Sequence, residues 1–273
     1  MLKSLRWIVY GLVVFAMNFP VLVTIITSFK ATREIAGNPG LWIEQPTLDN
    51  YLKVLTETER FNIFLYLANS TAAALIGTTL AILLAFPAAY VIARSETGQK
   101  LLLPLVINLR AVPLIVFAIP LYMMYQWLGL LDTQIGLGLI FTIVNIPLAL
   151  VMLVNAISDV PVELDEAATV DGASVFDIMI RIIRPVIRPT LVTTFIFGFI
   201  TAWNEFLFGL MLTTSRAVPM TVGASFFFAA SGGGVQWGMA SAVMILGALP
   251  PALLGIVMYR QLSGSMTAGA VKG

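Results

Sequence analysis

The chain has 273 residues, of which 59 % are hydrophobic and 11 % charged, with a mean hydropathy of +0.95 and a net charge of +1. Soluble domains carry about 25 % charged residues, so this composition indicates an integral membrane protein and gives no reason to expect nucleic acid as a partner. The absence of Cys and His excludes disulfides, thiol or imidazole metal sites and histidine acid–base chemistry, and the chain lacks the phosphate-binding GxxxxGK[ST] pattern. We therefore expect a protein that is not an enzyme, with no cofactor or metal of its own.

The first apolar segment, residues 7–29, lies between Arg6 and Lys30. The hydrophobic core of a secretory signal is shorter, about 7–15 residues, whereas about 20 residues cross a bilayer. We therefore expect a spanning helix that stays in the mature protein. The polar residues 30–60 contain several Gly and Pro, which predicts an extramembrane loop, with a short helix at residues 48–56.

Five more apolar segments predict five more spanning helices. They lie at residues 61–93, 101–128, 134–157, 190–212 and 238–259, and the segment 101–128 is interrupted by Arg110, Pro113 and Pro120. A polar turn is expected at residues 94–100 and a Gly-rich connection at residues 231–234. The sequence thus predicts an all-α integral membrane protein, a single domain over residues 1–273 with six transmembrane helices and a small flexible tail at residues 260–273.

A charge-dense segment, residues 159–189, interrupts the apolar sequence and is called the island below. It holds six of the fourteen acidic residues and three arginines. Pro161 and the acidic residues after it suit the first turn of a helix, which Gly172 then ends. Ser174 begins a capping-box pattern that opens a second helix, and prolines at its far end stop or bend it. The island is therefore predicted to form a helix–turn–helix bracket.

Helical spacing also predicts which sides of the bracket are apolar. On the first helix one side carries Leu164, Ala167 and Ala168. On the second helix the apolar side carries Val175, Phe176, Met179, Ile180 and Ile183, and the other side carries Arg181, Arg184 and Arg188.

The distribution of Lys and Arg predicts the orientation in the membrane. Nine of the fifteen lie on the side that holds both termini and the island, five lie on the other side, and Arg110 lies inside a span. Since positive residues favour the cytoplasm, we expect both termini, the polar turn and the loop at residues 156–189 there. Residues 30–60 are then extracytoplasmic.

The island resembles the coupling loop of permease subunits in ATP-binding-cassette importers. The residues that carry the resemblance are Glu166-Ala167-Ala168, Gly172, and Ile182 to Pro185, where Arg184 replaces the usual leucine. Further matches are Gly-Leu-Leu-Asp-Thr at residues 129–133, Trp-Asn-Glu-Phe at residues 203–206 and the C-terminal residues 267–273. Together they resemble the carbohydrate-uptake branch, specifically its second, six-helix, maltose-type permease, which has the type I importer fold.

The resemblance implies partners and residue roles. The partners are a second permease subunit, two nucleotide-binding ATPase subunits that hold ATP and Mg, and an extracytoplasmic solute-binding protein, in addition to the lipid bilayer. The residues that couple to the ATPase are Glu166, Ala167, Ala168, Asp171, Gly172, Phe176, Arg184 and Pro185. The residues of the tail that reach the ATPase are Gly269, Lys272 and Gly273.

Polar and aromatic residues inside the spans are candidates for the substrate path. Trp203, Asn204 and Glu205 combine an aromatic face with groups that bond hydroxyls, as sugar recognition requires; the alternative is an interfacial Trp beside a polar helix–helix contact. A charge at Arg110 is costly in lipid. This residue therefore either faces the path, where it would suit an anionic sugar derivative, or pairs with another helix, or has a structural role near the cytoplasmic end. Tyr122 is a weaker candidate.

We interpret the chain as a permease subunit of an ATP-driven, binding-protein-dependent importer that moves a sugar or sugar derivative by alternating access. A competing hypothesis is an ion-coupled secondary transporter, for which Glu205 is the one mid-membrane acid and no repeated pair of interrupted segments stands out. The same class of importer could also carry peptides, polyols, anionic sugar derivatives or phosphate esters. A membrane-embedded enzyme would need a catalytic constellation, and the sequence contains none. The island itself could be a plain interfacial loop whose arginines reach lipid headgroups.

Overall fold

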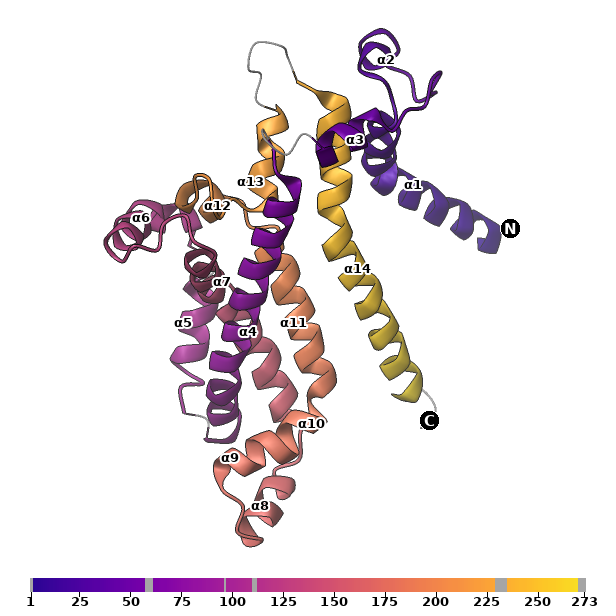
Figure 1. Ribbon diagram of the computed structural model, residues 1–273. Helices are drawn as coiled ribbons and strands as arrows, with labels where there is room; N and C mark the ends of the chain where they lie inside the picture. Colours follow the sequence, from indigo (N-terminus) through magenta and orange to yellow (C-terminus); the bar gives the residue numbers. More distant parts are fainter. Residues whose placement is uncertain (1, 57–60, 96, 110–111, 229–234, 270–273) are drawn as a thin grey trace. The chain divides into compact units, whose positions relative to one another are not determined.

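The computed structural model describes residues 2–56, 61–95, 97–109, 112–228 and 235–269, and within these ranges the chain is helical with one isolated β-bridge between Lys30 and Pro46. Figure 1 shows the helices in chain order. The chain divides into two compact units, residues 1–67 with 222–249 and residues 68–221 with 250–273, and each is described by itself. The expectation of a single domain stays a prediction.

Four of the six predicted spans are single helices that are long and apolar enough to cross a membrane, within the described ranges. They are α1 (Leu2–Ser28), α4 (Ile63–Ser95), α7 (Gln134–Ser158) and α14 (Trp237–Gly269). Residues 260–269 of the predicted tail belong to α14, which continues to Gly269, while the flexibility of the tail stays a prediction. The segment after Tyr259 contains no proline, so no residue lacks the N–H that continues the helix, although Gly264 and its serine neighbours are weak helix formers.

The predicted span at residues 101–128 is not one helix. Residues Leu102–Leu109 form α5, Leu114–Phe117 form the 3-10 helix η1 and Ala118–Trp127 form α6. Pro113 precedes η1 with φ −58° and ψ 124°, which is not helical. Its ring disfavours helix in the residue before it and it has no N–H to donate, so an unbroken helix through this position is disfavoured. Pro120 lies in the first turn of α6, where an N–H has no helical partner, and is accommodated there.

The predicted span at residues 190–212 is also interrupted. Helix α11 (Arg188–Trp203) ends before Glu205, and α12 (Leu207–Leu212) follows it. The Glu205 carboxylate accepts hydrogen bonds from the backbone N–H groups of Leu207, Phe208 and Gly209 at 3.1, 3.0 and 3.4 Å. These N–H groups have no partner within their own helix, so the Glu205 side chain supplies the start of a new one.

The second unit is built on close contacts between α4, α7 and α11, which lie side by side in Figure 1. A Cβ on Gly77 would lie 2.5 Å from the Phe141 Cβ, and a Cβ on Gly138 would clash with Ile76 Cγ2. On α11, a Cβ at Gly198 would lie 2.8 Å from Thr78 Cγ2. Small residues at these crossings let the helix backbones approach, which is how membrane helices associate.

The first unit contains residues 30–60, the predicted extramembrane loop, and its short helices. The predicted helix at residues 48–56 is confirmed as α3 (Asp49–Thr56), and a further helix, α2 (Thr32–Gly37), precedes it. Lys30 is 3 % exposed, and its ammonium group donates to the backbone carbonyls of Asn38 and Gly40. Later in the chain α13 (Met220–Ser225) and η3 (Phe226–Phe228) lead toward the predicted Gly-rich connection at residues 231–234, which lies outside the described residues.

Candidate functional site

The first arm of the island is α8 (Glu163–Val170), with three acidic residues in its first turn as predicted. Gly172 follows it with φ +81°, a conformation that costs an L-residue about 1–2 kcal/mol. The N–H of Ala173 donates to the Ala168 carbonyl at 2.9 Å and the N–H of Gly172 to the Thr169 carbonyl at 3.0 Å. This pair of bonds is the Schellman ending, so the prediction that Gly172 stops the helix is confirmed.

The second arm contains α9 (Val175–Asp177), a π-helical segment η2 (Ile178–Ile183) and α10 (Arg184–Val186). The predicted cap is confirmed, since the Asp177 N–H donates to the Ser174 hydroxyl at 3.2 Å and that hydroxyl donates to the Asp177 carboxylate at 2.6 Å. An 80° bend then separates this arm from α11. Pro189 lies in the first turn of α11, so the predicted bend at the prolines is also confirmed.

The inner side of the island packs on the rest of the second unit. Ala168, Ile178, Met179, Ile183 and Ile187 belong to one buried cluster with residues of α4 and α7. The predicted apolar side of the second arm is therefore confirmed for Met179 and Ile183.

The predicted apolar sides were wrong in part. Phe176 is 70 % exposed and Val175 is 61 % exposed, and on the first arm Leu164 and Ala167 are exposed while Ala168 is buried. The reason is that the contact with α4 is made by the side of α8 that carries Asp165 and Ala168.

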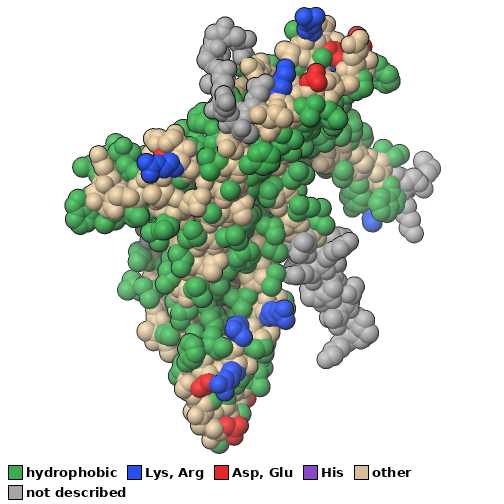
Figure 2. All heavy atoms as spheres, viewed as in Figure 1, with side chains coloured by type: hydrophobic (Ala, Val, Ile, Leu, Met, Phe, Trp, Pro, Cys, Tyr) green, Lys and Arg blue, Asp and Glu red, His purple; other side chains and the backbone are tan. Residues whose placement is uncertain are grey.

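The outer side of the island carries most of the residues assigned to coupling. Among them Glu166, Ala167, Asp171, Gly172, Phe176, Arg184 and Pro185 are all exposed, and Ala168 is buried beneath them. Figure 2 shows acidic and basic side chains gathered over this end of the second unit, below a mainly hydrophobic surface along its helices. An exposed aromatic ring beside carboxylates and guanidinium groups is suited to bind another protein.

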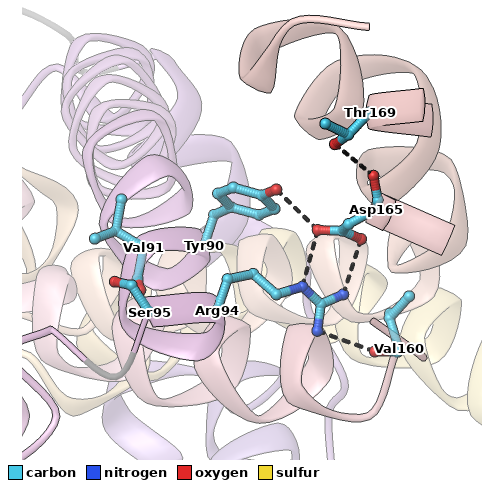
Figure 3. A network of polar contacts seen from close by, with 7 residues as sticks. All are labelled: Tyr90, Val91, Arg94, Ser95, Val160, Asp165 and Thr169. Atoms are coloured by element: carbon cyan, nitrogen blue, oxygen red, sulfur yellow. Dashed lines mark hydrogen bonds and ion pairs between the residues drawn. The ribbon is translucent and has the colours of Figure 1, made fainter. Parts of the chain in front are cut away.

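A buried ion pair fastens the island to the end of α4 (Figure 3). The Arg94 guanidinium donates to the two carboxylate oxygens of Asp165 at 2.9 and 3.2 Å and to the Val160 carbonyl at 3.0 Å. The Tyr90 hydroxyl donates to the same carboxylate at 2.8 Å, and both side chains of the ion pair are only 10 % exposed. This network could not be predicted from the sequence, since a single Arg at a helix end and one acid among six give no signal that they meet.

A second polar cluster lies at the other end of the second unit, before α7. The Asp132 carboxylate accepts hydrogen bonds from four consecutive backbone N–H groups, those of residues 214–217, and from the hydroxyls of Thr214 and Ser215. Burial would raise the pKa of Asp132, but the backbone donors, those of Arg216 and Ala217 first, outweigh it and hold the pKa well below its usual range. Thr133 accepts from the Gly136 N–H and caps α7. Residues 129–133, which carry part of the family resemblance, thus include the carboxylate that binds their own loop to the loop at residues 214–217.

The second unit also contains a cavity of about 660 Å³. Its lining is mainly aliphatic and aromatic, with Thr201 and Glu205 as polar members. Of the residues expected to line the path, Glu205 contributes to this cavity. Trp203 is instead buried against Phe199, with ring centroids 5.6 Å apart, and Asn204 is exposed, with its amide donating to the Ile200 carbonyl.

The remaining predicted residues fall elsewhere. Tyr122 lies on α6 and is 40 % exposed. Gly269 is the last residue of α14, while Arg110, Lys272 and Gly273 lie outside the described residues. The roles proposed for all of them stay predictions.

A family model described as the inner membrane component of binding-protein-dependent transport systems matches residues 77–267, which is more than half of the chain. The match begins within α4 and includes the island, the cavity residues and most of α14.

Known proteins resemble the chain over nearly its whole length. It is 30 % identical over 277 residues to the sulfoquinovosyl glycerol transport system permease protein SmoH of Agrobacterium fabrum, covering 99 % of this chain and 94 % of that protein. It is 33 % identical over 257 residues to the trehalose/maltose transport system permease protein MalG of Thermococcus litoralis, covering 93 % and 91 %. A chain of a bacterial ABC transporter involved in the import of the acidic polysaccharide alginate has the same fold, with a TM-score of 0.78 at 17 % identity and 95 % coverage of both chains.

Proposed function

Because the chain belongs to the family of inner membrane components of binding-protein-dependent transport systems, we propose that it is a permease subunit of an ATP-driven importer that carries a sugar or sugar derivative by alternating access. It is a multi-pass inner-membrane protein and a transport component. Relatives named for trehalose/maltose and sulfoquinovosyl glycerol support a carbohydrate as the substrate. Since the sequence lacks a phosphate-binding loop, ATP and Mg are held by partner ATPase subunits.

The observation that carries this proposal is the outer side of the island. Glu166 and Phe176 are exposed there. The Phe176 side chain is 70 % exposed, so its apolar ring lacks the favourable free energy that burial against a partner would supply. A docked ATPase subunit would bury the ring of Phe176 and pair the Glu166 carboxylate with a basic residue. Ala167, with its small side chain, lets the partner backbone come close.

The attachment of the island supports a role in transmitting force. The ion pair between Arg94 and Asp165 and the buried cluster beneath α8 make the bracket move with α4 and α7 rather than swing freely. Movement imposed on the island by the closing ATPase dimer would therefore reach the helices that line the cavity. Alternating access of this kind needs two arrangements of the helix bundle, each favoured by a different state of the ATPase.

The proposed orientation follows from the distribution of Lys and Arg. Both termini and the island then face the cytoplasm, and residues 30–60 face the other side, where a solute-binding protein delivers the substrate. The remaining partners would be a second permease subunit, which completes the path, and two ATPase subunits. The family resemblance assigns Gly269, Lys272 and Gly273 to contact with the ATPase dimer.

The cavity beside α7 and α11 is our candidate for this chain's share of the substrate path. Thr201 can bond a sugar hydroxyl, and the apolar lining suits the C–H faces of a sugar ring. The Glu205 carboxylate has less capacity to bind a substrate hydroxyl, because it already accepts hydrogen bonds from three backbone N–H groups. Arg110 would add a positive charge for an anionic sugar derivative; if Arg110→Gln left affinity and substrate range unchanged, this part of the proposal would be withdrawn.

Uptake into proteoliposomes tests the proposal. The chain is reconstituted with its ATPase, its partner permease and its binding protein, and radiolabelled sugars are offered outside. We expect uptake that requires ATP inside the vesicle and the binding protein outside, and that does not respond to a proton or sodium gradient. Uptake driven by an ion gradient without ATP would instead support a secondary transporter.

A further inference from the structure

The short helix α3 (Asp49–Thr56) has three distinct sides. At about 100° per residue, Asn50 and Val54 share one side, and they are 3 % and 2 % exposed. A second side carries Asp49, Lys53 and Thr56, all of which are exposed. The third side carries Leu52 and Leu55, continued by Leu48, which directly precedes the helix and accepts the Leu52 N–H at 2.9 Å. The three leucines fall within an arc of about 60° at helical spacing and are 59 % (Leu48), 56 % (Leu52) and 37 % (Leu55) exposed.

Contact with water would not stabilise a side of the helix that carries only leucines. A helix that packs on protein with one side and is otherwise in water carries polar residues on the sides that face the water. Here the exposed surface is divided into a polar half and a leucine half, which is the pattern of a helix that lies along a membrane surface.

The contacts of α3 fix its depth relative to the membrane. The Asn50 amide donates to the carbonyls of Ser28 and Lys30 at 2.9 and 2.8 Å, and the Tyr51 and Ser28 hydroxyls are 2.8 Å apart. Ser28 is the last residue of the spanning helix α1. Helix α3 is therefore attached to the point where a span ends.

A second contact gives the same depth. A Cβ at Gly238 would lie 2.6 Å from the Asn50 side chain, so α3 also lies against the first turn of α14. The candidate span in α14 begins at Trp237, which is 52 % exposed, and exposed Trp residues gather at membrane interfaces. One span ends and another begins beside α3, so both place it at the boundary of the bilayer.

We propose that α3 is an interfacial helix, with Leu48, Leu52 and Leu55 inserted among the lipids at the membrane surface where α1 ends. The lipid is the occupant that the surroundings favour, because α3 lies where one candidate span ends and another begins, and no residue in the apolar window of α1 is buried within the chain. Asp49 and Lys53 remain on the aqueous side. The helix would then hold the extramembrane loop at a fixed height and orientation relative to the bilayer. This proposal rests on the membrane location of the chain and is independent of the substrate or of ATP.

Fluorescent labels on single cysteines test the proposal, since the chain contains no Cys. Leu52→Cys and Lys53→Cys, neighbours on the same helix that are both exposed, are labelled with an environment-sensitive fluorophore in the full chain, purified with its partner subunits and placed in phosphatidylcholine nanodiscs. We expect a blue-shifted emission for the label at 52. Brominated phosphatidylcholine should quench that label severalfold more than the label at 53, most strongly with bromines near the carbonyl end of the acyl chain. Iodide in the buffer should show the reverse order.

Two results would overturn the proposal. Equal quenching of both labels by iodide would place the leucine side in water, open to a soluble partner. A blue-shifted label at 52 that ignores brominated lipid would mean that protein covers the leucines. The pair Leu48→Cys and Asp49→Cys repeats the test one turn earlier and decides the outcome if the first pair does not give monodisperse complexes.

Discussion

Replacing Arg94 by Met tests how firmly the island is attached to α4. The substitution keeps an apolar stem of similar length but removes three hydrogen bonds, two to Asp165 and one to the Val160 carbonyl. The Asp165 carboxylate, only 10 % exposed in the wild type, would then keep the Tyr90 hydroxyl as its partner on α4. Breaking a buried pair by removing one member costs about 3–5 kcal/mol, and the nearness of water at this end of the molecule favours the lower value, about 3 kcal/mol.

Hydrogen exchange of the α8 amides measures this loss. If α8 opens from α4 independently of the rest, about 3 kcal/mol corresponds to roughly 100-fold faster exchange in Arg94→Met than in the wild type. The double variant Arg94→Met/Asp165→Leu should exchange more slowly than Arg94→Met alone, because it leaves no uncompensated charge.

The exposed pair between Arg181 and Asp177 on the second arm serves as the matched control. Its side chains are 80 and 36 % exposed, so Arg181→Met should leave exchange unchanged. An increase of less than about threefold in Arg94→Met, equivalent to less than 1 kcal/mol, would refute the idea that this ion pair fixes the island.

Three further changes have defined outcomes. Gly172→Ala should destabilise the turn of the island by about 1–2 kcal/mol because of its positive φ, while Gly255→Ala, which meets no atom within 4 Å, should not lower the thermal midpoint. Asp132→Asn should lower stability by on the order of 1 kcal/mol at neutral pH. Because the folded pKa of Asp132 is depressed, the difference from the wild type should stay constant down to about pH 4 and shrink only as the pH falls further toward that folded pKa; a difference that vanishes near pH 6 would contradict the assignment. Glu205→Ala should cost about 1 kcal/mol through loss of the cap on α12, whereas Glu205→Gln, which keeps an acceptor, should cost less in the same thermal unfolding measurement.

The sequence predicted the features of the fold that depend on local chemistry. Apolar length identified the four unbroken spans, and the cap at Ser174 and the stop at Gly172 were read correctly because each needs only residues within one turn. Of the two broken spans, the interruption at Pro113 was predicted and the break at Glu205 was not. Hydropathy counts residues 101–128 and 190–212 as continuous, but Pro113 and Glu205 act through backbone hydrogen bonds, which hydropathy does not register.

The sides of the island depended on contacts that the sequence does not contain. Asp165 points inward because it binds Arg94, which lies 71 positions earlier in the chain, in the last turn of α4. Because α8 turns Asp165 toward α4, Ala167 lies on the exposed side of that helix. On the second arm, Met179 and Ile183 belong to the buried cluster, whereas Phe176 lies outside it and is exposed. Periodicity separates an apolar side from a polar one, but it cannot say which apolar residues meet their own fold and which remain for a partner.

The most direct test of the central claim is ATP hydrolysis by the reconstituted complex, with and without its binding protein and sugars. The wild type is compared with Glu166→Lys, which reverses an exposed charge on the island, and with Glu44→Lys, which makes the same change on the extramembrane loop. We predict stimulation by the binding protein with sugar in the wild type and in Glu44→Lys, and its loss in a folded Glu166→Lys complex. Full stimulation in Glu166→Lys would contradict the role of the island in coupling, and the absence of any ATP hydrolysis alongside ion-driven uptake would contradict the importer itself.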